Sequence, residues 1–479
     1  MQTYHFAVDL GATSGRTILA SFDGTKVGME EISRFKHPML PINGNLYWNL
    51  PGLYAEVIAG LRKAGRIVAD RGAFLSSIGI DSWGCDVAFF SKDGALCGLP
   101  HCYRDAHTEG AVDKFHRNLT REQTYDKTGI QFMDFNTLFQ LDTMVRNGED
   151  AVRNADKILF IPDALSYMLT GRAVTEQTVA STSQMLDPRT GELDDELLAE
   201  AGLDRSKFGP VVKPGEIIGR LTPQVQEAVG LGAVPVVAVA GHDTASAVIG
   251  VPTPDEEYAY LSCGTWSLLG VESPAPIIND ESRRYNFTNE GGIDGSIRFL
   301  KNICGMWLFE RCREEWTPDE APVDDVATLA ALVNDSDIPS VINPDDPSFD
   351  HPASMTKAIR EYCEKTGQPV PSVPADYVHI IFRSLAARYG EVLGWLRELR
   401  PTPEVKRLHV IGGGSRNGHL MQMTADTLGI PVVAGPAEST ALGNVLVQLR
   451  ACGEVSSYAD MRKVSIASTD TVTYTPSDK

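Results

Sequence analysis

The sequence lacks the features that mark secreted and membrane-spanning proteins. Its eight cysteines are scattered over 479 residues without a Cys-x-x-Cys pair, so free thiols in a reducing compartment are expected. The first residues, MQTYHFAVDLGA, contain no basic segment and no long apolar stretch, which argues against a signal peptide. The longest apolar runs have only the length of strands. These absences predict a cytoplasmic protein.

The chain is also short of positive charge. Lys and Arg number 43 against 63 Asp and Glu, which gives a formal net charge of −20. Such an excess of acid argues against general affinity for nucleic acid or anionic membranes. A polyanionic substrate would need a local pocket of cations or backbone amides. The sequence leaves monomer and dimer open.

Several common catalytic motifs are missing. No Gly-Lys pair occurs, which excludes a P-loop of the form GxxxxGK[ST]. HExxH is absent, and no close cluster of His and Cys has zinc spacing. GxSxG is absent as well, which argues against a nucleophile-elbow hydrolase. The remaining candidates are polar residues beside glycines.

Strand and helix patterns alternate along the chain and predict an α/β fold. A first set of elements ends near Gly250-Val251-Pro252-Thr253-Pro254, which is hinge-like. A second set then begins with the same strand–turn–strand order, which predicts two lobes built from similar halves. The expected strands cover residues 6–9, 17–22, 77–80, 236–240, 258–262, 266–271, 408–411 and 430–434, the expected helices 49–68, 377–399 and 438–449 with another from about 418, and a hairpin is expected over 86–96.

Glycine-containing turns follow several of these strands. In the turn over residues 10–16, backbone amides, hydroxyls and Arg16 could hold a phosphate, and Asp9 could hold a hydrated magnesium ion. Cys263-Gly264-Thr265 would form a second phosphate turn, and Gly412-Gly413-Gly414 would let a flat or anionic ligand approach bare backbone. Each turn taken alone is equally compatible with an ordinary hairpin or strand-to-helix connection.

Two further strand ends carry polar side chains. Asp81-Ser82-Trp83-Gly84-Cys85-Asp86 places an indole and two carboxylates beside a glycine, which suits a sugar or an ordinary half-buried turn. His242 and Asp243 follow the apolar run 236–240 and precede small residues that can start a helix. Asp243 is therefore either a helix cap or a general base that the helix N-terminus keeps ionised.

The ordered motifs VDLGATSGR, IDSWGCD, YRD, GHDTASA, LSCGTWS, NEGG, LKNICGMWL and IGGGSRN resemble those of the FGGY carbohydrate kinases, from residue 6 to about 450. The resemblance implies two ribonuclease-H-like, actin-like ATPase domains with an active-site cleft between them. The domain bounds that we expect are 1–250 for the sugar-binding lobe, 251–455 for the nucleotide-binding lobe, and 456–479 for a tail that packs back on the first lobe. NEGG and LKNICGMWL point to the branch that phosphorylates L-rhamnulose at its 1-hydroxyl.

The resemblance also implies roles for individual positions. Asp243 matches the catalytic base, and His242, Thr244, Gly84 and Asn302 match positions in or near the sugar site. ATP and Mg²⁺ are the implied cofactors, with Asp9 as the metal ligand. The positions that match the ATP site are Ala12, Thr13, Ser14, Gly15, Arg16, Gly264, Thr265, Glu310, Gly412, Gly413 and Gly414.

Two positions depart from the family pattern. Glu310 stands where a Gln is expected near the nucleotide, and a carboxylate close to phosphates would be unfavourable. Cys85 replaces an aliphatic residue, which weakens the match to the sugar pocket. Another FGGY kinase, acting on L-fuculose or xylulose, and a non-catalytic actin-like ATP-binding module stay open as alternatives. A base at position 243 argues against the module, which would need no such group.

Overall fold

The computed structural model describes residues 2–317, 319–321, 326–350, 352–399 and 404–477, and they fold into two compact units. Unit 1 comprises Met1–Pro254, Glu272–Phe299 and Ser439–Thr469, and unit 2 comprises Asp255–Val271, Leu300–Glu438 and Asp470–Lys479. The first passage from unit 1 to unit 2 follows Pro254, at the end of the predicted hinge. The domain bounds of the sequence analysis follow chain order, whereas each unit gathers separate segments. Those bounds stay a prediction.

The main sheet of unit 1 has the order β13-β14-β6-β1-β2-β3. Its central strand β1 pairs in parallel with β6 and antiparallel with β2, and β6 pairs in parallel with β14. The predicted strands at 6–9, 17–22 and 77–80 are confirmed within β1, β2 and β6. The bounds are β1 Thr3–Leu10, β2 Ser14–Phe22, β3 Val27–Lys36, β6 Ser77–Ser82, β13 Ile217–Arg220 and β14 Pro235–Val237.

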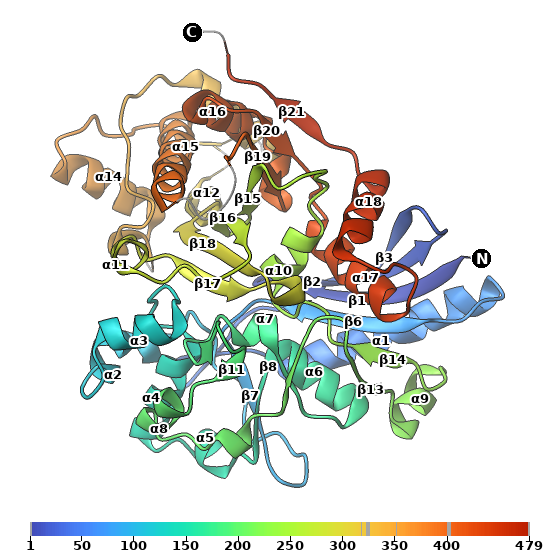
Figure 1. The fold of residues 1–479 in the computed structure, drawn as a ribbon. Helices are drawn as coiled ribbons and strands as arrows, with labels where there is room; N and C mark the ends of the chain where they lie inside the picture. The colour runs from blue at the N-terminus through green and yellow to red at the C-terminus, as the bar shows by residue number, and fades with distance from the viewer. Residues whose placement is uncertain (1, 318, 322–325, 351, 400–403, 478–479) are drawn as a thin grey trace. The chain divides into compact units, whose positions relative to one another are not determined.

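Helices cover both faces of this sheet (Figure 1). One face carries α1 (Leu50–Asp70) and α6 (Ile161–Thr170), whose apolar side chains share a buried cluster with Phe6, Val8 and Ile78. The other face carries α10 (Asp243–Ile249) and α17 (Ser439–Ala451), which share a second cluster with Ala7. Because side chains alternate along a strand, odd and even positions of β1 face opposite helix layers.

Helix α1 shows how the local sequence directs these elements. The Asn49 side chain accepts a hydrogen bond from the Gly52 amide at 3.1 Å, and Pro51 lies in the first turn. Both features are typical of helix N-termini. Leu53, Val57 and Leu61 recur at a spacing of four and are buried against the sheet. The helix predicted over 49–68 is confirmed.

The second large sheet has the order β17-β18-β16-β15-β19-β20-β21, and apart from the edge strand β17 (Thr288–Gly291) it repeats the strand order of the main sheet of unit 1. Strand β15 pairs antiparallel with β16 and in parallel with β19, as β1 does with β2 and β6. The halves therefore share one topology, as the repeated strand–turn–strand order predicted. The bounds are β15 Tyr258–Cys263, β16 Trp266–Ser273, β18 Ile297–Cys304, β19 Arg407–Ile411, β20 Val432–Ala434, β21 Val472–Tyr474, α12 Trp307–Glu315, α13 Val326–Ala331, α14 Met355–Lys365, α15 Pro374–Leu399 and α16 Gly418–Leu428.

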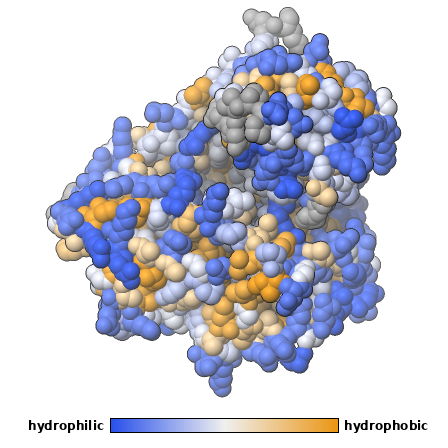
Figure 2. Space-filling model, turned by 180° about the vertical axis from the view of Figure 1, so that it is seen from behind, coloured by the Kyte–Doolittle hydropathy of each residue, from blue (hydrophilic) through white to orange (hydrophobic). Residues whose placement is uncertain are grey.

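Further elements of unit 1 surround a buried cluster of their own, which includes Phe89, Phe139 and Phe160. Among the described residues, no helix is long and apolar enough to cross a membrane. The face shown in Figure 2 is predominantly hydrophilic, with smaller apolar areas between the polar ones. The remaining unit-1 elements used below are β5 Asn45–Tyr47, β7 Val87–Phe90, β8 Lys157–Phe160, α3 Arg121–Thr128, α5 Asp150–Asn154, α11 Asp280–Arg284, β17 Thr288–Gly291, α18 Tyr458–Ser468 and the 3₁₀ turn η1 Ala106–Thr108.

One predicted strand is wrong in extent. The strand expected over 236–240 ends at Val237, because the ladder with β6 is interrupted and resumes at a bridge between Ser82 and His242. His242 lies two residues later than an unbroken ladder would place it, so the chain bulges there. The hairpin expected over 86–96 is confirmed, because Phe90 and Leu96 are antiparallel bridge partners and the Cys97 amide donates to the Phe89 carbonyl at 2.8 Å. Strand β7 also pairs antiparallel with β8.

Helices α10 and α17 approach closely at a glycine. A Cβ atom added to Gly443 would overlap the Ser246 carbonyl oxygen, which belongs to the backbone and cannot move alone. We expect Gly443→Ala to lower the free energy of unfolding by about 1–3 kcal/mol, the usual cost of overpacking. Gly394→Ala in α15 is the matched control, because a Cβ there meets nothing within 4 Å. Chemical denaturation measures both variants, and an unchanged Gly443→Ala would contradict the close approach.

Candidate active site

Two carboxylates end neighbouring strands of unit 1. Asp9 and Asp81 are register partners in the parallel pair β1–β6. Both carboxylates lie on the face of the sheet that α17 covers. Two residues before Asp9, Ala7 packs in the same apolar cluster as α17, and two residues before Asp81, a Cβ on Gly79 would meet Asn444 of α17. Register and pleat therefore bring both side chains to one sheet edge on one face.

Asp9 is held by the arginine that the sequence placed in the phosphate turn. Arg16 donates from Nε at 2.9 Å and from Nη2 at 2.6 Å to Asp9 Oδ2. The two residues face each other across the β1–β2 hairpin, whose turn closes through a bond from the Gly11 amide to the Ser14 carbonyl at 3.0 Å. Strand β2 begins at Ser14, so the turn is tighter than the predicted 10–16. Thr13 is exposed and Ala12 and Ser14 half-buried, while Gly15 is buried.

Asp81 is fully buried and only partly hydrogen-bonded. Its Oδ2 accepts a bond from Asn444 Nδ2 at 2.6 Å, whereas Oδ1 has no hydrogen-bond partner among the described residues. Burial, together with the negative charge of Asp9, raises the pKa of Asp81 well above its ordinary value. A buried oxygen without a donor is costly unless a cation or a proton meets it.

Asp243 lies at the first position of α10, and His242 is the N-cap residue. Asp243 is therefore not the N-cap residue of α10, and the interpretation of Asp243 as the cap of this helix is wrong. Its Oδ1 accepts from the Thr244 amide at 2.6 Å, and its side chain is 28% exposed, so the carboxylate reaches solvent. Burial and the charge of Asp9 raise the pKa of Asp243, while His242 and the Thr244 bonds oppose that rise. A raised pKa makes this carboxylate a stronger base.

His242 connects Asp243 to a buried ion pair. Arg298 Nη2 lies 3.2 Å and Glu290 Oε2 lies 3.3 Å from His242 Nδ1, so this nitrogen faces a donor and a carboxylate at once. The other ring nitrogen, Nε2, lies 3.3 Å from Asp243 Oδ1. Arg298 also pairs with Glu290 of β17 at 3.1 Å. Burial raises the pKa of Glu290, but Arg298 and His242 outweigh it and lower the pKa overall.

The segment after β6 has a different role from the one its aromatic residue suggested. Trp83 is only 5% exposed and stacks on His37 with ring centroids 5.2 Å apart, so its indole belongs to the core. Asp86 accepts bonds from the indole nitrogens of Trp48 at 2.6 Å and Trp83 at 2.9 Å. Burial raises the pKa of Asp86 to about 6. Gly84 is half-buried, and a Cβ there would meet Thr182 Oγ1 at 2.9 Å.

In unit 2, two glycine turns meet at the end of β15. Gly412 and Gly414 pack on Cys263, and Gly412 has a φ of 84°, so their lack of a side chain is needed for packing. Gly413 and Gly264 have open space around them, since a Cβ on Gly413 would meet nothing within 4 Å and one on Gly264 only an oxygen at 3.9 Å. Gly413 opens a 3₁₀ turn, and the predicted helix begins at Gly418. Bare backbone is therefore available at both turns.

The other unit-2 positions lie on β18, α12 and the turn before β16. Asn302 is half-buried on β18, and Thr265 is half-buried in the turn. Glu310 of α12 pairs with Arg313 one turn later, with Nε 2.9 Å and Nη2 2.8 Å from Oε2. This pairing offsets the charge that made Glu310 an unfavourable neighbour for phosphates.

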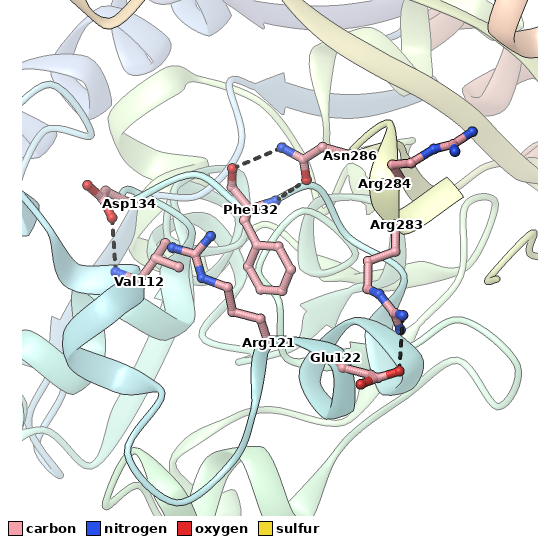
Figure 3. Close-up of a pocket in the computed structure, with 8 residues that line it drawn as sticks. All are labelled: Val112, Arg121, Glu122, Phe132, Asp134, Arg283, Arg284 and Asn286. Atoms are coloured by element: carbon pink, nitrogen blue, oxygen red, sulfur yellow. Dashed lines mark hydrogen bonds and ion pairs between the residues drawn. The ribbon is translucent and has the colours of Figure 1, made fainter. Parts of the chain in front are cut away.

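Unit 1 also contains a pocket of about 690 Å³ that is lined by other residues. Figure 3 shows three of its arginines, with Arg283 directed to Glu122 and Asn286 bonded to the backbone of Phe132. Two of the arginines have carboxylate partners, Arg121 with Asp113 and Arg283 with Glu122. None of the site residues that the sequence singled out lines this pocket. Its lining residues are Val112, Arg121, Glu122, Phe132, Asp134, Arg283, Arg284 and Asn286.

The chain matches two protein-family models in succession. Residues 4–250 match the N-terminal domain of the FGGY family of carbohydrate kinases, and residues 259–452 match the C-terminal domain of that family. The chain belongs to the FGGY family of carbohydrate kinases. The resemblance found in the motifs is thereby confirmed, and with it the α/β fold of two similar halves and the class of ATP-dependent carbohydrate kinase.

Curated relatives are similar over the whole chain. A protein named Rhamnulokinase from Bacteroides thetaiotaomicron is 53% identical, covering 100% of this chain and 97% of its own. Another Rhamnulokinase, from Pectobacterium atrosepticum, is 42% identical over 98% of this chain and 92% of its own. Among solved structures, a ligand-bound xylulose kinase from Lactobacillus acidophilus has a TM-score of 0.81 at 16% identity, over 99% of this chain and 94% of that chain. Plasmodium falciparum glycerol kinase with ADP has a TM-score of 0.80 at 14% identity, with the same coverage. These structures share the fold.

Sequence reasoning gave no role to Glu290 or Arg298, and it treated Asp81 only as one of two carboxylates that could suit a sugar. Asp81 and Glu290 lie inside quoted motifs, IDSWGCD and NEGG, but nothing in the chain order connects them to Asp9 or His242. A charged residue within an apolar strand, as Arg298 is in IRFL, was the available signal, because such a residue is rarely buried without a partner.

Proposed function

We propose that this kinase transfers the γ-phosphoryl group of ATP to the 1-hydroxyl of L-rhamnulose, giving L-rhamnulose 1-phosphate and ADP in rhamnose catabolism. The observation that carries the proposal is full-length identity of 53% and 42% to two relatives named Rhamnulokinase. Asp243 supplies the chemistry, as a partly exposed carboxylate at the start of a helix. The negative charge of the chain and its free cysteines support action in the cytoplasm on small molecules.

Asp243 acts as the base. Its carboxylate accepts the proton of the sugar hydroxyl while that oxygen forms a bond to the γ-phosphorus and the bond to the β–γ bridging oxygen breaks. His242 Nε2–H, 3.3 Å from Asp243 Oδ1, orients the carboxylate. Arg298 and Glu290, which lie 3.2 Å and 3.3 Å from His242 Nδ1, in turn hold the imidazole ring in place. Thr244, Gly84 and Asn302 complete the proposed sugar-binding set.

The proposed ATP-binding set consists of backbone at glycine turns. Gly264, Thr265 and Gly412–Gly414 supply it in unit 2, and Ala12 to Arg16 in unit 1. Unbonded amides in such turns bind phosphate oxygens well. In this assignment Arg16 holds Asp9 in place as well as facing anions. Glu310, already paired with Arg313, is directed to a neutral part of the nucleotide.

Asp9 and Asp81 are the residues that fit a magnesium ion. Mg²⁺ prefers carboxylate oxygens and water, and the unpartnered buried Oδ1 of Asp81 is an oxygen of this kind. When bound, the ion supplies positive charge that offsets the charge of the transferring phosphates. Neither carboxylate needs to take a proton in the transfer.

Sugar preference tests the proposal. We expect L-rhamnulose to give the highest kcat/KM in a panel of ketoses and polyols with ATP and magnesium, and L-fuculose and xylulose at least 10-fold lower values. An inverted or missing hydroxyl leaves buried polar partners unpaired, which costs this much or more. A coupled assay of ADP release measures each sugar, and release without sugar is the control.

Each contrary outcome identifies its own alternative. Highest turnover with L-fuculose or xylulose would assign the chain to another branch of the family. ATP binding without phosphorylation of any sugar would favour a non-catalytic module. Best turnover with glycerol or gluconate would contradict the proposal altogether.

A further inference from the structure

A second polar cluster in unit 1 takes no part in the proposed reaction. His101, Asp105 and His107 lie within one seven-residue stretch, and their ligand atoms lie within 4.8 Å of one another. Asp105 is the N-cap of the 3₁₀ turn η1, which contains His107, and His101 bridges to Tyr47 of β5. The side chains of all three are at most 6% exposed. A turn and a neighbouring strand thus hold two imidazoles and a carboxylate together inside the protein.

His107 is the member of this cluster that its surroundings leave unsatisfied. Neither of its ring nitrogens has a hydrogen-bond partner among the described residues, although its side chain is only 6% exposed. The nearest acceptor, Asp105 Oδ1, lies 3.5 Å from Nδ1. A buried imidazole without partners costs free energy that a ligand to its lone pair would recover. Of the two nitrogens, Nδ1 is the one beside Asp105, in a group of three side chains whose ligand atoms lie within 4.8 Å of one another.

We propose that His101, Asp105 and His107 bind a divalent transition-metal ion of the zinc type. A tetrahedral zinc ion with bonds of about 2.0–2.1 Å places its ligand atoms about 3.3 Å apart. The observed separations are 3.2 Å from His101 Nδ1 to Asp105 Oδ2 and 3.5 Å from His107 Nδ1 to Asp105 Oδ1. Each imidazole therefore lies near ligand spacing from one oxygen of Asp105, the three ligand atoms lie within 4.8 Å of one another, and water completes the fourth position.

Glu149 contacts the ring nitrogen of His101 that does not face Asp105. Its Oε2 lies 3.3 Å from His101 Nε2, while Nδ1 of the same ring faces Asp105. A histidine that binds metal through one nitrogen usually donates the other N–H to a carboxylate, which fixes its tautomer. Glu149 caps α5, so the ion would connect that helix to η1 and β5.

The ligand set distinguishes this ion from the magnesium of the reaction. Two imidazole nitrogens and one carboxylate suit zinc and its neighbours, whereas magnesium prefers oxygen ligands only. The site has no Cys and uses His and Asp at spacings of four and two, so it does not match the His and Cys spacings that are typical of zinc sites. Its role is to stabilise the fold, because none of its residues belongs to the proposed base, sugar or ATP sets.

A second cluster provides an internal comparison. His5, Cys452 and Glu454 also lie within 4.8 Å of one another. There, however, His5 Nδ1 is bonded to Ser77 at 2.7 Å, and Nε2 lies 3.1 Å from Glu454. With both of its nitrogens already satisfied, His5 has no unmet need for a metal.

Zinc binding to the full-length protein tests the proposal. The protein is freed of metal with a chelator, dialysed against buffered Zn²⁺, and analysed for bound zinc by mass spectrometry. We expect about one equivalent in the native chain and in Cys452→Ser, and loss of that equivalent in His107→Gln. Glu149→Gln, a change at a partly exposed side chain, should weaken zinc binding by about 10- to 100-fold. Zinc should raise the Tm of the native chain and leave that of His107→Gln unchanged.

The controls separate a metal site from a structural ion pair. Circular dichroism and kinase activity with magnesium show whether each variant is folded, and Asp105→Asn removes the anionic ligand while keeping a capping side chain. His116→Gln is the matched histidine control, since both His116 nitrogens have partners. Equal zinc content in His107→Gln and the native chain, or loss only in Cys452→Ser, would overturn the proposal. So would a native chain that binds no zinc, which would leave His101 as a protonated bridge between Asp105 and Glu149.

Discussion

Replacement of Asp243 by asparagine is expected to lower kcat by about 10²- to 10⁴-fold, the usual contribution of a general base. Asparagine keeps the shape of the side chain and can still accept a bond from the Thr244 amide, now 2.6 Å from Oδ1. It cannot take the proton of the sugar hydroxyl. Because partial burial and Asp9 raise the pKa of Asp243, the native carboxylate is a stronger base than an exposed aspartate. Steady-state kinetics with saturating ATP and sugar measure the effect.

The same variant should be about as stable as the native protein. Asp243 is the first residue of α10 and not its N-cap, so no capping bond to the helix is lost. Removal of its charge also relieves the repulsion from Asp9. Asp280→Asn is the matched control, since Asp280 is the first residue of α11 and is 83% exposed on its side chain. Near-normal turnover of Asp243→Asn would assign the carboxylate a purely structural role, and a Tm far below that of the control would point to unfolding.

Replacement of Arg298 by alanine is expected to lower the free energy of unfolding by about 3–5 kcal/mol, the cost of breaking a buried ion pair. Arg298 is 1% exposed and lies 3.1 Å from Glu290, whose side chain is 5% exposed. Its Nε also donates to the Gly291 carbonyl at 2.9 Å. Truncation leaves the Glu290 charge buried without its arginine, beside His242 at 3.3 Å and the Thr288 hydroxyl at 3.4 Å. Urea denaturation measures the free energy of unfolding, and steady-state kinetics on the folded protein measure kcat.

A double variant separates the charge from the packing. Arg298→Met together with Glu290→Gln removes both charges while retaining most of the volume, so we expect it to be more stable than Arg298→Ala. Its kcat should still fall, because His242 loses the donor that holds Nδ1. If Arg298→Ala and the native protein have the same urea midpoint, the Arg298–Glu290 pair contributes nothing to the free energy of unfolding. That result would also contradict the proposed role of the pair in orienting His242.

Local sequence determined most of the elements. Short apolar runs beside turn residues placed β1, β2 and β6, and the helical spacing of Leu53, Val57 and Leu61 placed α1. These signals are local, since a strand or helix depends on the period of its own side chains. The repeated strand–turn–strand order indicated two similar halves for the same reason. Motif order then identified the family before any contact was known.

The predicted bounds of a strand were wrong where a partner strand elsewhere in the chain decides where the pairing ends. The run over residues 236–240 is apolar throughout, yet the strand ends at Val237 because β6 pairs again only at His242. The hairpin after Phe90 forms as predicted, but β7 has a further partner in β8, which begins at Lys157 and which the local sequence did not indicate. The spacing of apolar residues in one segment does not show which distant segment it will pair with.

The site itself depended on tertiary structure for every contact among its side chains. The sequence singled out Asp9, His242 and Asp243 from their neighbours, but strand register set Asp81 beside Asp9, and chain folding brought Arg298 to His242. In the second cluster, His101, Asp105 and His107 are close in sequence, yet only burial leaves the His107 nitrogens without partners. Residue type determines which bonds a side chain can make, and only the packed fold determines which of them are satisfied.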